Sequence, residues 1–291
     1  MSAFSRFFVT VADDFGKSPS VNAAVAAAHD RGVLTSASLM AGGEAFDDAV
    51  RIANVRRELS VGIHITLCDG EAVLGPSRIA GLVGEDGCFA KNPAEAWLRC
   101  SLGALRPQIT SEVKAQFDRL ADAGIHPTHI DAHHHLQMHP VIFDILCREA
   151  SERGIGWIRI PGEPLPALFD MRSLRRGVMP FLEWAVFGLL GGRHKRAAER
   201  QGLHVAKRVF GLSRTGFVDE PYVLRVLART KGPVDEMFAH PDLATDAGRR
   251  ELGTLTSSSV RDAASALGIS LAGYGELKGA RAAVGSAWEK P

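Results

Sequence analysis

Cysteine is scarce in this sequence and never closely spaced. The 291 residues contain only four cysteines, Cys68, Cys88, Cys100 and Cys147, and no two of them form a CxxC pair. This spacing argues against a disulfide framework and against a zinc knuckle. We therefore expect reduced thiols, as in a cytoplasmic protein.

Long apolar runs and an excess of charge are also missing. No apolar stretch approaches the roughly 18–20 residues that span a bilayer, and the nearest candidate, 179–190, contains Glu183. The first residues lack the basic start, apolar stretch and cleavage site of a signal peptide, so we expect a cytoplasmic location. The net charge of +1 gives no electrostatic reason to expect a nucleic-acid partner.

Short apolar segments alternate with helical patterns along most of the chain. We expect strands over residues 7–12, 35–40, 61–67, 128–132, 156–160, 234–239 and 269–272. We expect helices over residues 21–29, 46–59, 109–123, 140–153 and 256–267. This alternation predicts an α/β fold with a parallel sheet. The length suits one domain over 1–291, with a long excursion at about 68–107 and an apolar helical insert at about 179–212.

A cluster of histidines is the most distinctive feature of the chain. The run Asp131-Ala132-His133-His134-His135, with His139 nearby, places four of the 11 histidines within seven positions. So many imidazoles at a strand end are costly in a core and suit a divalent metal ion. Three consecutive imidazoles cannot share one direction, so one or two would ligate and another would contact substrate or neighbouring groups. The alternative is a hydrogen-bonded polar belt without metal.

Other polar residues lie at or near the ends of other expected strands. Asp13 and Asp14 follow the first strand, His64 lies in the third, and His240 follows a late strand. Reactive residues of parallel α/β folds collect at the carboxyl ends of strands. Taken singly, the aspartates could cap a helix, His64 could be a satisfied core histidine, and His240 could belong to an ordinary loop.

One carboxylate and two imidazoles would form a mixed metal site with positions left for water and substrate. Such a site serves hydrolysis, because the metal polarises a carbonyl group and acidifies water. A second carboxylate could then act as general base, and a separate histidine such as His240 could protonate a leaving amine. Zinc suits the imidazoles, and magnesium suits a more hydrated site.

Residues 179–190 carry apolar side chains around most of an expected helix, and residues 191–196 (GGRHKR) add a basic cluster. A fully buried helix is the favoured interpretation. The alternative is an apolar lid for a lipid-like substrate, or a peripheral contact with an anionic membrane surface.

The sequence resembles the YdjC-like carbohydrate deacetylases, which include bacterial chitooligosaccharide deacetylases. Four segments carry the resemblance: 11–18 (VADDFGKS), 32–40 (GVLTSASLM), 61–67 (VGIHITL) and 127–136 (PTHIDAHHHL). Residues 18–25 (SPSVNAAV) are similar to the branch associated with hopanoid biosynthesis, called HpnK. The resemblance implies an irregular (β/α) TIM-like barrel related to polysaccharide deacetylases.

The resemblance also implies roles for particular residues. It makes Asp14, His64 and His133 the ligands of one divalent ion, magnesium or zinc. It makes Asp13 the general base and His240 the acid, while Arg159 and His135 would orient the base or contact substrate. Gln137 stands where family members often have a histidine, so the substrate range is open.

We therefore expect a metal-dependent hydrolase that removes the acetyl group from an N-acetylated amino sugar. The likeness to the hopanoid branch implies a GlcNAc-bearing hopanoid glycolipid as substrate. Two alternatives remain, a metal-dependent phosphoesterase and a non-catalytic protein that binds sugar or lipid. A homodimer is the default for an enzyme of this size.

Overall fold

The structure is a computed structural model in which residues 6–163, 179–230 and 232–277 are described. For residues 179–184 the description covers the backbone alone.

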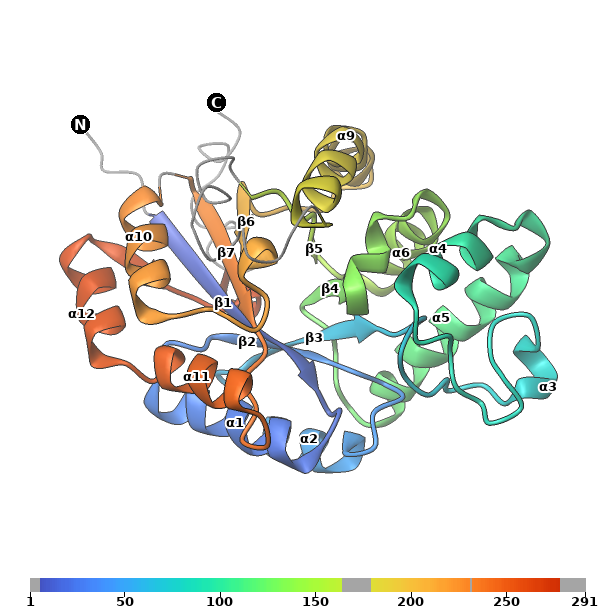
Figure 1. Ribbon diagram of the computed structural model, residues 1–291, viewed down its shortest axis with the longest axis horizontal. Helices are drawn as coiled ribbons and strands as arrows, with labels where there is room; N and C mark the ends of the chain where they lie inside the picture. The colour runs from blue at the N-terminus through green and yellow to red at the C-terminus, as the bar shows by residue number, and fades with distance from the viewer. Residues whose placement is uncertain (1–5, 164–178, 231, 278–291) are drawn as a thin grey trace.

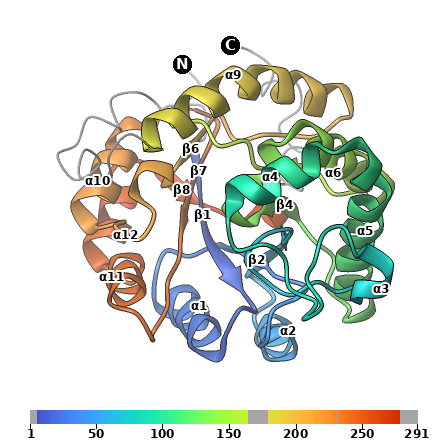
Figure 2. The same ribbon diagram turned by 45° about the vertical axis from the view of Figure 1, so that its right-hand side comes forward.

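Eight strands form one curved parallel sheet in the described residues, with helices around its outer side (Figures 1 and 2). The strands are β1 (Arg6–Phe15), β2 (Ser36–Leu39), β3 (Ser60–Ile65), β4 (His129–Ala132), β5 (Trp157–Ile158), β6 (Arg208–Phe210), β7 (Val234–Ala239) and β8 (Ile269–Leu271). Their order is β5-β4-β3-β2-β1-β7-β6, and β8 pairs with β1. The predicted α/β class with a parallel sheet is confirmed.

The long first strand organises the sheet. Along its first half β1 pairs with β8, and along its second half it pairs with β2, while β7 runs beside it on the other edge. Two isolated bridges, Trp157–His204 and Gly162–Val209, link the region of β5 to that of β6. These bridges join the two edges of the curved sheet irregularly, as in a barrel that closes without a full strand pair.

Most connections between strands are helical. The helices are α1 (Pro19–Arg31), α2 (Phe46–Val55), α3 (Pro76–Ile79), α4 (Pro93–Ser101), α5 (Arg106–Asp122), α6 (Pro140–Arg153), α9 (Met179–Arg200), α10 (Glu220–Arg229), α11 (Asp246–Leu255) and α12 (Ser258–Ala266). Short 3-10 turns are η1 (Gly103–Leu105), η2 (His133–Met138) and η3 (Leu212–Arg214). The expected helix over 46–59 is wrong at its end, because α2 stops at Val55.

Local sequence signals set several boundaries. Ser18 caps α1 by accepting a hydrogen bond from the Val21 amide, and a proline occupies the first turn. Helix α6 begins at Pro140 and ends at Arg153, and the capping residue Gly154 has a φ of 67°, the left-handed conformation that glycine adopts without steric cost. The predicted helix over 140–153 and strand over 234–239 are therefore confirmed at both ends.

The excursion between β3 and α5 has structure of its own. It contains α3, α4 and η1, and two isolated antiparallel bridges, Glu71–Cys88 and Val83–Phe89, join its chain. All four cysteines are free, as predicted, and Cys88 is the one that is half-buried rather than buried.

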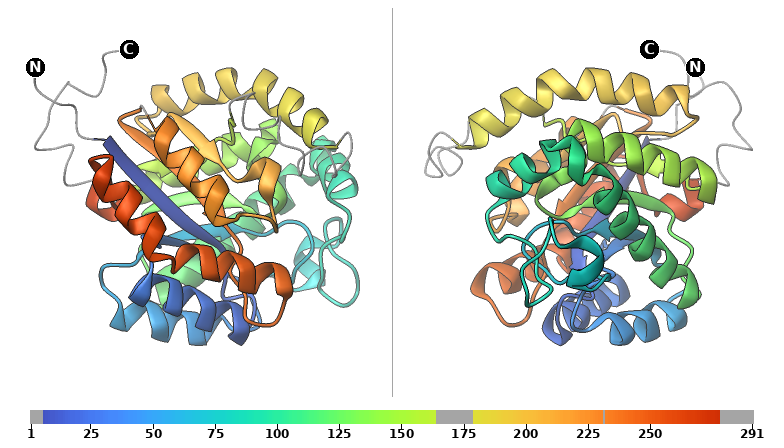
Figure 3. Two further views of the ribbon diagram at one scale, coloured as in Figure 1. Left: turned by 60° about the vertical axis from the view of Figure 1, so that its left-hand side comes forward. Right: turned by 90° about the vertical axis from the view of Figure 1, so that its right-hand side faces the viewer.

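Helix α9 runs along one side of the molecule beside α6 (Figure 3). Phe187 is buried, whereas Val186 and Leu189 are 45% and 83% exposed. The favoured interpretation of a fully buried helix is therefore wrong for this part of α9. Residues 179–184 of the same expected helix lie outside the described side chains. Within the described residues, no helix combines the length and the apolar character needed to cross a membrane.

Gly62 is required by close packing inside the sheet. A Cβ atom at this position would lie 2.4 Å from the Cε1 atom of His129. The imidazole of His129 has little room to move, because Ser38 and Thr128 each hydrogen-bond one of its nitrogens at 3.0 Å. The glycine before His64 therefore allows β3 and β4 to carry their polar side chains side by side.

We expect the change Gly62→Ala to lower the free energy of unfolding by about 1–3 kcal/mol, because the added methyl group overpacks a fixed ring. The control is Gly253→Ala in α11, where no atom lies within 4 Å of a new Cβ. That change should leave stability unchanged or raise it by up to about 1 kcal/mol. Urea denaturation measures both, and equal stability of Gly62→Ala and the wild type would contradict the packing argument.

Candidate active site

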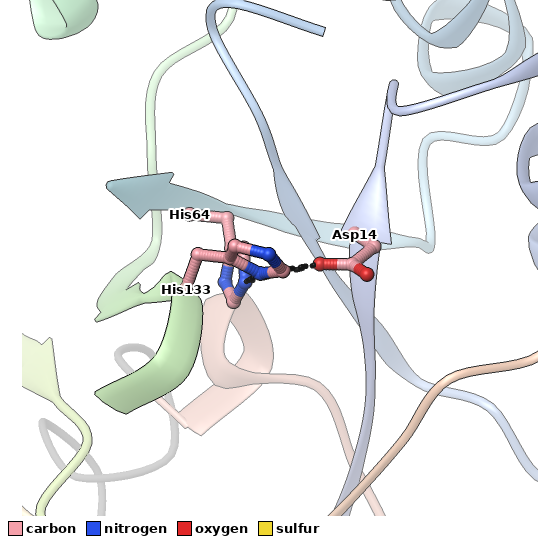
Figure 4. A group of neighbouring side chains, drawn as sticks. All are labelled: Asp14, His64 and His133. Carbon is pink, nitrogen blue, oxygen red and sulfur yellow. Dashed lines mark hydrogen bonds and ion pairs between the residues drawn. The ribbon is translucent and has the colours of Figure 1, made fainter. Parts of the chain in front are cut away.

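Three side chains from distant parts of the sequence converge at the carboxyl ends of β1, β3 and β4 (Figure 4). Asp14 lies near the end of β1, His64 in β3, and His133 at the start of η2, directly after β4. All three side chains are buried. They include both histidine segments and one member of the aspartate pair that the sequence singles out.

The ligand atoms of these residues form a compact triangle. The Oδ1 atom of Asp14 is 2.9 Å from Nδ1 of His133 and 3.4 Å from Nε2 of His64. The two imidazole nitrogens are 3.3 Å apart. An ion bound at about 2.1 Å by each of three ligands places those ligands roughly 3.0–3.4 Å apart. The triangle therefore has the size of one face of a metal coordination shell.

An unusual backbone conformation allows both aspartates to serve one site. Adjacent side chains of a regular strand point to opposite faces. Asp14 has a φ of 63°, in the left-handed region, and the register between β1 and β2 shifts between Ala12 and Phe15. Aspartate tolerates this conformation better than most residues. The local turn brings Asp14 to the histidines while Asp13 keeps its place on the inner face.

The three consecutive histidines point to different partners. His134 and His135 both have left-handed φ values, 53° and 54°, so the chain turns sharply after His133. The Nε2 atom of His134 is 3.8 Å from Oδ2 of Asp69, and its side chain is 35% exposed. The ring of His135 packs against that of Phe238, with centroids 5.0 Å apart. The expectation that the three histidines would point in different directions is confirmed. The side chain of His135 lies outside the triangle.

Burial also fixes the protonation of these two histidines. It lowers the pKa of His134 to about 4 and holds the pKa of His135 well below its ordinary value. Both rings are therefore neutral near pH 7. A neutral imidazole can donate one hydrogen bond and accept another, which suits contact with an uncharged polar substrate.

Asp131 orients the imidazole of His64 by bonding the ring nitrogen that faces away from Asp14. Its Oδ1 atom lies 2.6 Å from Nδ1 of His64, which leaves Nε2 of that ring facing Asp14. Ser38 donates a hydrogen bond of 2.6 Å to the other carboxylate oxygen of Asp131. Carboxylates commonly fix metal-binding histidines in this way. Burial opposes the protonation of His64, but Asp131 outweighs it and raises the pKa of His64 to about 10. A cation would displace that proton.

Asp13 makes a separate contact with Arg159, the residue that follows β5. Both terminal nitrogens of the guanidinium donate to the Asp13 carboxylate, at 2.8 and 2.9 Å. The same guanidinium reaches Asp131 at 2.9 Å and donates through Nε to Glu236. The Nε2 atom of His240 lies 3.9 Å from Asp13, and its side chain is 29% exposed. The structure thus places Asp13, Arg159 and His240 together beside the triangle.

The buried cluster is rich in carboxyl groups. Asp13, Asp131 and Glu236 surround the guanidinium of Arg159, and the buried carboxyl group of Asp14 faces the imidazoles of His64 and His133 instead. Lys17 adds a partly exposed ammonium group 2.9 Å from Oδ2 of Asp14. Buried carboxylates require compensation by opposite charge. At the triangle the proton of His64 supplies part of this compensation, and a divalent cation would take its place.

The lowered pKa of Asp14 shows that its ionised form is strongly favoured over its protonated form. Burial would raise this pKa, but the adjacent His133 and His64 imidazoles outweigh burial and hold the pKa well below its ordinary value. An ionised carboxylate and two imidazole nitrogens form a donor set that suits zinc and related ions. The residues therefore fit a divalent metal ion.

Two other groups of ligand atoms are less suitable. Asp13, His64 and Asp131 lie close together, but both carboxylates already pair with Arg159. Asp69, His133 and His134 form the other group, in which Asp69 is half-buried and His134 exposed. The triangle of Asp14, His64 and His133 combines full burial with no competing guanidinium.

Sequence reasoning missed several residues of this cluster. Asp131 was noted only as part of the histidine run, and Lys17, Glu236 and Ser38 were not singled out. Side-chain alternation could have found two of them, because Asp131 is two residues before His133, and Glu236 is four residues before His240.

Gln137, which stands where family members often have a histidine, is buried. Neither polar atom of its side chain has a hydrogen-bond partner among the described residues.

Comparison with known proteins gives the chain a family. The sequence model of the family described as YdjC-like protein matches residues 8–266, so the chain belongs to this family. A carbohydrate deacetylase of Geobacillus stearothermophilus is 39% identical over 160 residues, which are 55% of this chain and 60% of that protein. A chitooligosaccharide deacetylase of Salmonella paratyphi B is 35% identical over 178 residues, which are 60% of this chain and 68% of that protein. The match with the Geobacillus protein thus spans less than two thirds of its length.

A solved structure of similar fold matches almost the whole chain. It is a proposed cellobiose-phosphate cleavage protein from Enterococcus faecalis V583, with a TM-score of 0.75 and 21% sequence identity over 94% of this chain and 99% of that chain. Likeness at this level of identity concerns the fold, and it confirms the barrel-like α/β architecture.

We expect Asp14→Asn and His133→Ala to weaken the binding of zinc or magnesium. Asparagine tolerates the left-handed backbone of Asp14, so that variant tests the loss of charge. The loss of affinity should exceed the roughly 10–100-fold that removal of a ligand's hydrogen-bond partner costs. Isothermal titration measures the affinity, with His134→Ala as the control that retains it. Unchanged affinity in Asp14→Asn, or equal loss in His134→Ala, would show that the ion binds elsewhere.

Stability should fall between pH 7 and pH 5, partly because of His129. Burial lowers the pKa of His129 to about 3, whereas an unfolded histidine titrates near 6.5. Below pH 6.5 the unfolded chain therefore binds the additional proton, and the free energy of unfolding decreases by up to about 1.4 kcal/mol per pH unit. Urea denaturation of His129→Gln should show a weaker pH dependence over this range, and an unchanged slope would refute the assignment.

Proposed function

We propose that this YdjC-like protein is a metal-dependent carbohydrate N-deacetylase. The observation that carries the proposal is the triangle of Asp14, His64 and His133, with Asp13 and His240 beside it. This arrangement offers ligands for one ion, a second carboxylate that does not belong to the triangle, and a separate histidine. Hydrolysis of an amide bond needs groups of these kinds.

The proposed reaction removes an acetyl group from an amino sugar. A divalent ion held by Asp14, His64 and His133 would supply a Lewis acid that polarises the amide carbonyl and acidifies water. Asp13 takes a proton from the attacking water, and Arg159 keeps its carboxylate in place through two hydrogen bonds. Acetate and the free amine are the products.

His240 is the proposed acid. Its position supports the role, because Nε2 lies 3.9 Å from Asp13 and the side chain is more exposed than those of the triangle. The backbone amide of His240 donates a hydrogen bond to Glu251, which fixes the turn after β7. A proton from His240 converts the departing nitrogen into a good leaving group.

The proposed substrate is an N-acetylated amino sugar. The names of the Geobacillus and Salmonella relatives support a carbohydrate deacetylase. The finer proposal, a GlcNAc-bearing hopanoid glycolipid, draws support from α9, whose Phe187 ring lies 6.0 Å from that of His135. Exposed Val186 and Leu189 on the same helix offer apolar surface for a hydrocarbon. A cytoplasmic location, peripheral membrane contact and a homodimer remain predictions.

The phosphoesterase alternative has less support from the geometry. It would favour two metal ions and a basic clamp for phosphate. The basic side chains at the described site are Lys17 and Arg159, and carboxylates already neutralise both. A non-catalytic binding protein would have no need for Arg159 to hold Asp13 beside a metal site.

We expect Asp13→Asn and His240→Asn to lower kcat for acetate release by about 10²–10⁴-fold, the usual contribution of a general base or acid. Both variants should keep the metal, because neither residue belongs to the triangle. The assay uses an N-acetylated chitooligosaccharide with added zinc or magnesium, and His126→Asn is the control that should keep full activity. Undiminished acetate release by Asp13→Asn would contradict the proposal, as would release of phosphate from a sugar phosphate without any release of acetate.

A further inference from the structure

A buried tyrosine–glutamate pair lies behind the proposed general base. Glu236 in β7 and Tyr274 after β8 are both buried. The Tyr274 hydroxyl donates a hydrogen bond to one carboxyl oxygen of Glu236, and Nε of Arg159 donates to the other. The remaining nitrogens of Arg159 hold Asp13. A continuous chain of hydrogen bonds thus runs from Tyr274 to Asp13.

The planarity of the guanidinium gives this chain a directional effect. The three nitrogens of Arg159 lie in one rigid plane. A partner that fixes Nε therefore also fixes the direction of the two terminal nitrogens. Phe238 supports the same plane, because the guanidinium carbon lies 4.8 Å from the centroid of its ring. Glu236 and Phe238 are two residues apart in β7 and so project from one face of the strand.

Tyr274 has little freedom to move away from Glu236. Its ring packs against those of His129 and Trp157, with centroid distances of 4.6 and 5.1 Å. The backbone amide of Gly275 donates to Ser60 at 3.0 Å. A Cβ atom at Gly273 would lie 2.2 Å from Oγ of Ser60, so the chain approaches β3 as closely as glycine permits. Tyr274 also lies beyond residues 8–266, the segment that matches the family model.

We propose that Glu236 and Tyr274 are positioning residues that fix Arg159 and, through it, the orientation of the Asp13 carboxylate. The kinetic part of this inference rests on the proposed function. Neither residue contacts the triangle of metal ligands, so their effect is separate from metal binding. Neither touches the reacting atoms, so substrate affinity should also be independent of them.

The structure offers a matched control for the loss of a tyrosine hydroxyl. Tyr222 is also buried, and its hydroxyl donates a hydrogen bond of 2.6 Å to Glu163. The Tyr222 hydroxyl also accepts a hydrogen bond from the Gly211 amide, and Glu163 accepts one from the Ser213 amide, so this pair supports the chain that follows β6. Tyr222→Phe therefore removes a bond of the same kind without altering the support of Arg159.

The kinetic experiment compares Tyr274→Phe, Glu236→Gln, Glu236→Ala and Tyr222→Phe in the metal-loaded protein, with an N-acetylated chitooligosaccharide as substrate. We expect Tyr274→Phe to lower kcat by about 10–100-fold, the range in which small misplacements of reacting groups act. KM and bound metal should stay within about twofold of the wild type. Glutamine keeps a carbonyl oxygen for Arg159, so Glu236→Gln should retain more activity than Glu236→Ala. Tyr222→Phe should keep the wild-type kcat.

A second measurement does not depend on catalysis. The exchange of the Arg159 Nε proton with solvent, followed by NMR, should be slow in the wild type and in Tyr222→Phe. It should be faster in Tyr274→Phe, because Glu236 loses its support. The inference is overturned if Tyr274→Phe keeps both the wild-type kcat and slow exchange, or if Tyr222→Phe lowers kcat equally. Absence of acetate release by the wild type would contradict the proposed function instead, and the exchange rates would then decide this inference alone.

Discussion

The candidate site depends on the contact between one buried guanidinium and three carboxyl groups. Arg159 pairs with Asp13 and Asp131 and bonds Glu236, and each of these residues comes from a different strand. Removal of one partner from a buried ion pair typically costs about 3–5 kcal/mol, because the other charge stays buried. Arg159 therefore joins β1, β4 and β7 beneath the place where the reaction is proposed to occur. Its two hydrogen bonds to Asp13 keep that carboxylate outside the triangle of Asp14, His64 and His133.

The carboxylate of Asp14 explains why a cation suits the neighbouring triangle. Asp14 turns away from Arg159 through its left-handed backbone and faces two imidazoles instead. Asp131 connects the two halves, because one of its oxygens bonds His64 and the other meets Arg159. The adjacent aspartates thus acquire different environments, one set by a guanidinium and one by imidazoles. Different environments allow similar carboxyl groups to play different roles.

The sequence predicted much of the scaffold but fewer of the supporting contacts. The strand over 234–239 and the helix over 140–153 were accurate because proline and glycine mark their limits. The aspartate pair and the histidines were identified as a site because strand ends meet in a parallel sheet. Sequence alone could not show that Asp14 adopts a left-handed conformation, which depends on the register shift beside β2. Tyr274 was also beyond reach, because the pairing of β8 with β1 delivers it from the far end of the chain.

The central claim is that Asp14, His64 and His133 hold one ion while Arg159 holds Asp13 apart from it. The most direct test is a crystal structure of the protein grown with zinc, with anomalous scattering data collected at the zinc edge. The account predicts one strong peak about 2.0–2.2 Å from Oδ1 of Asp14, Nε2 of His64 and Nδ1 of His133. A peak bound instead by Asp69 and His134, or a structure in which Asp13 leaves Arg159 to ligate the ion, would contradict it.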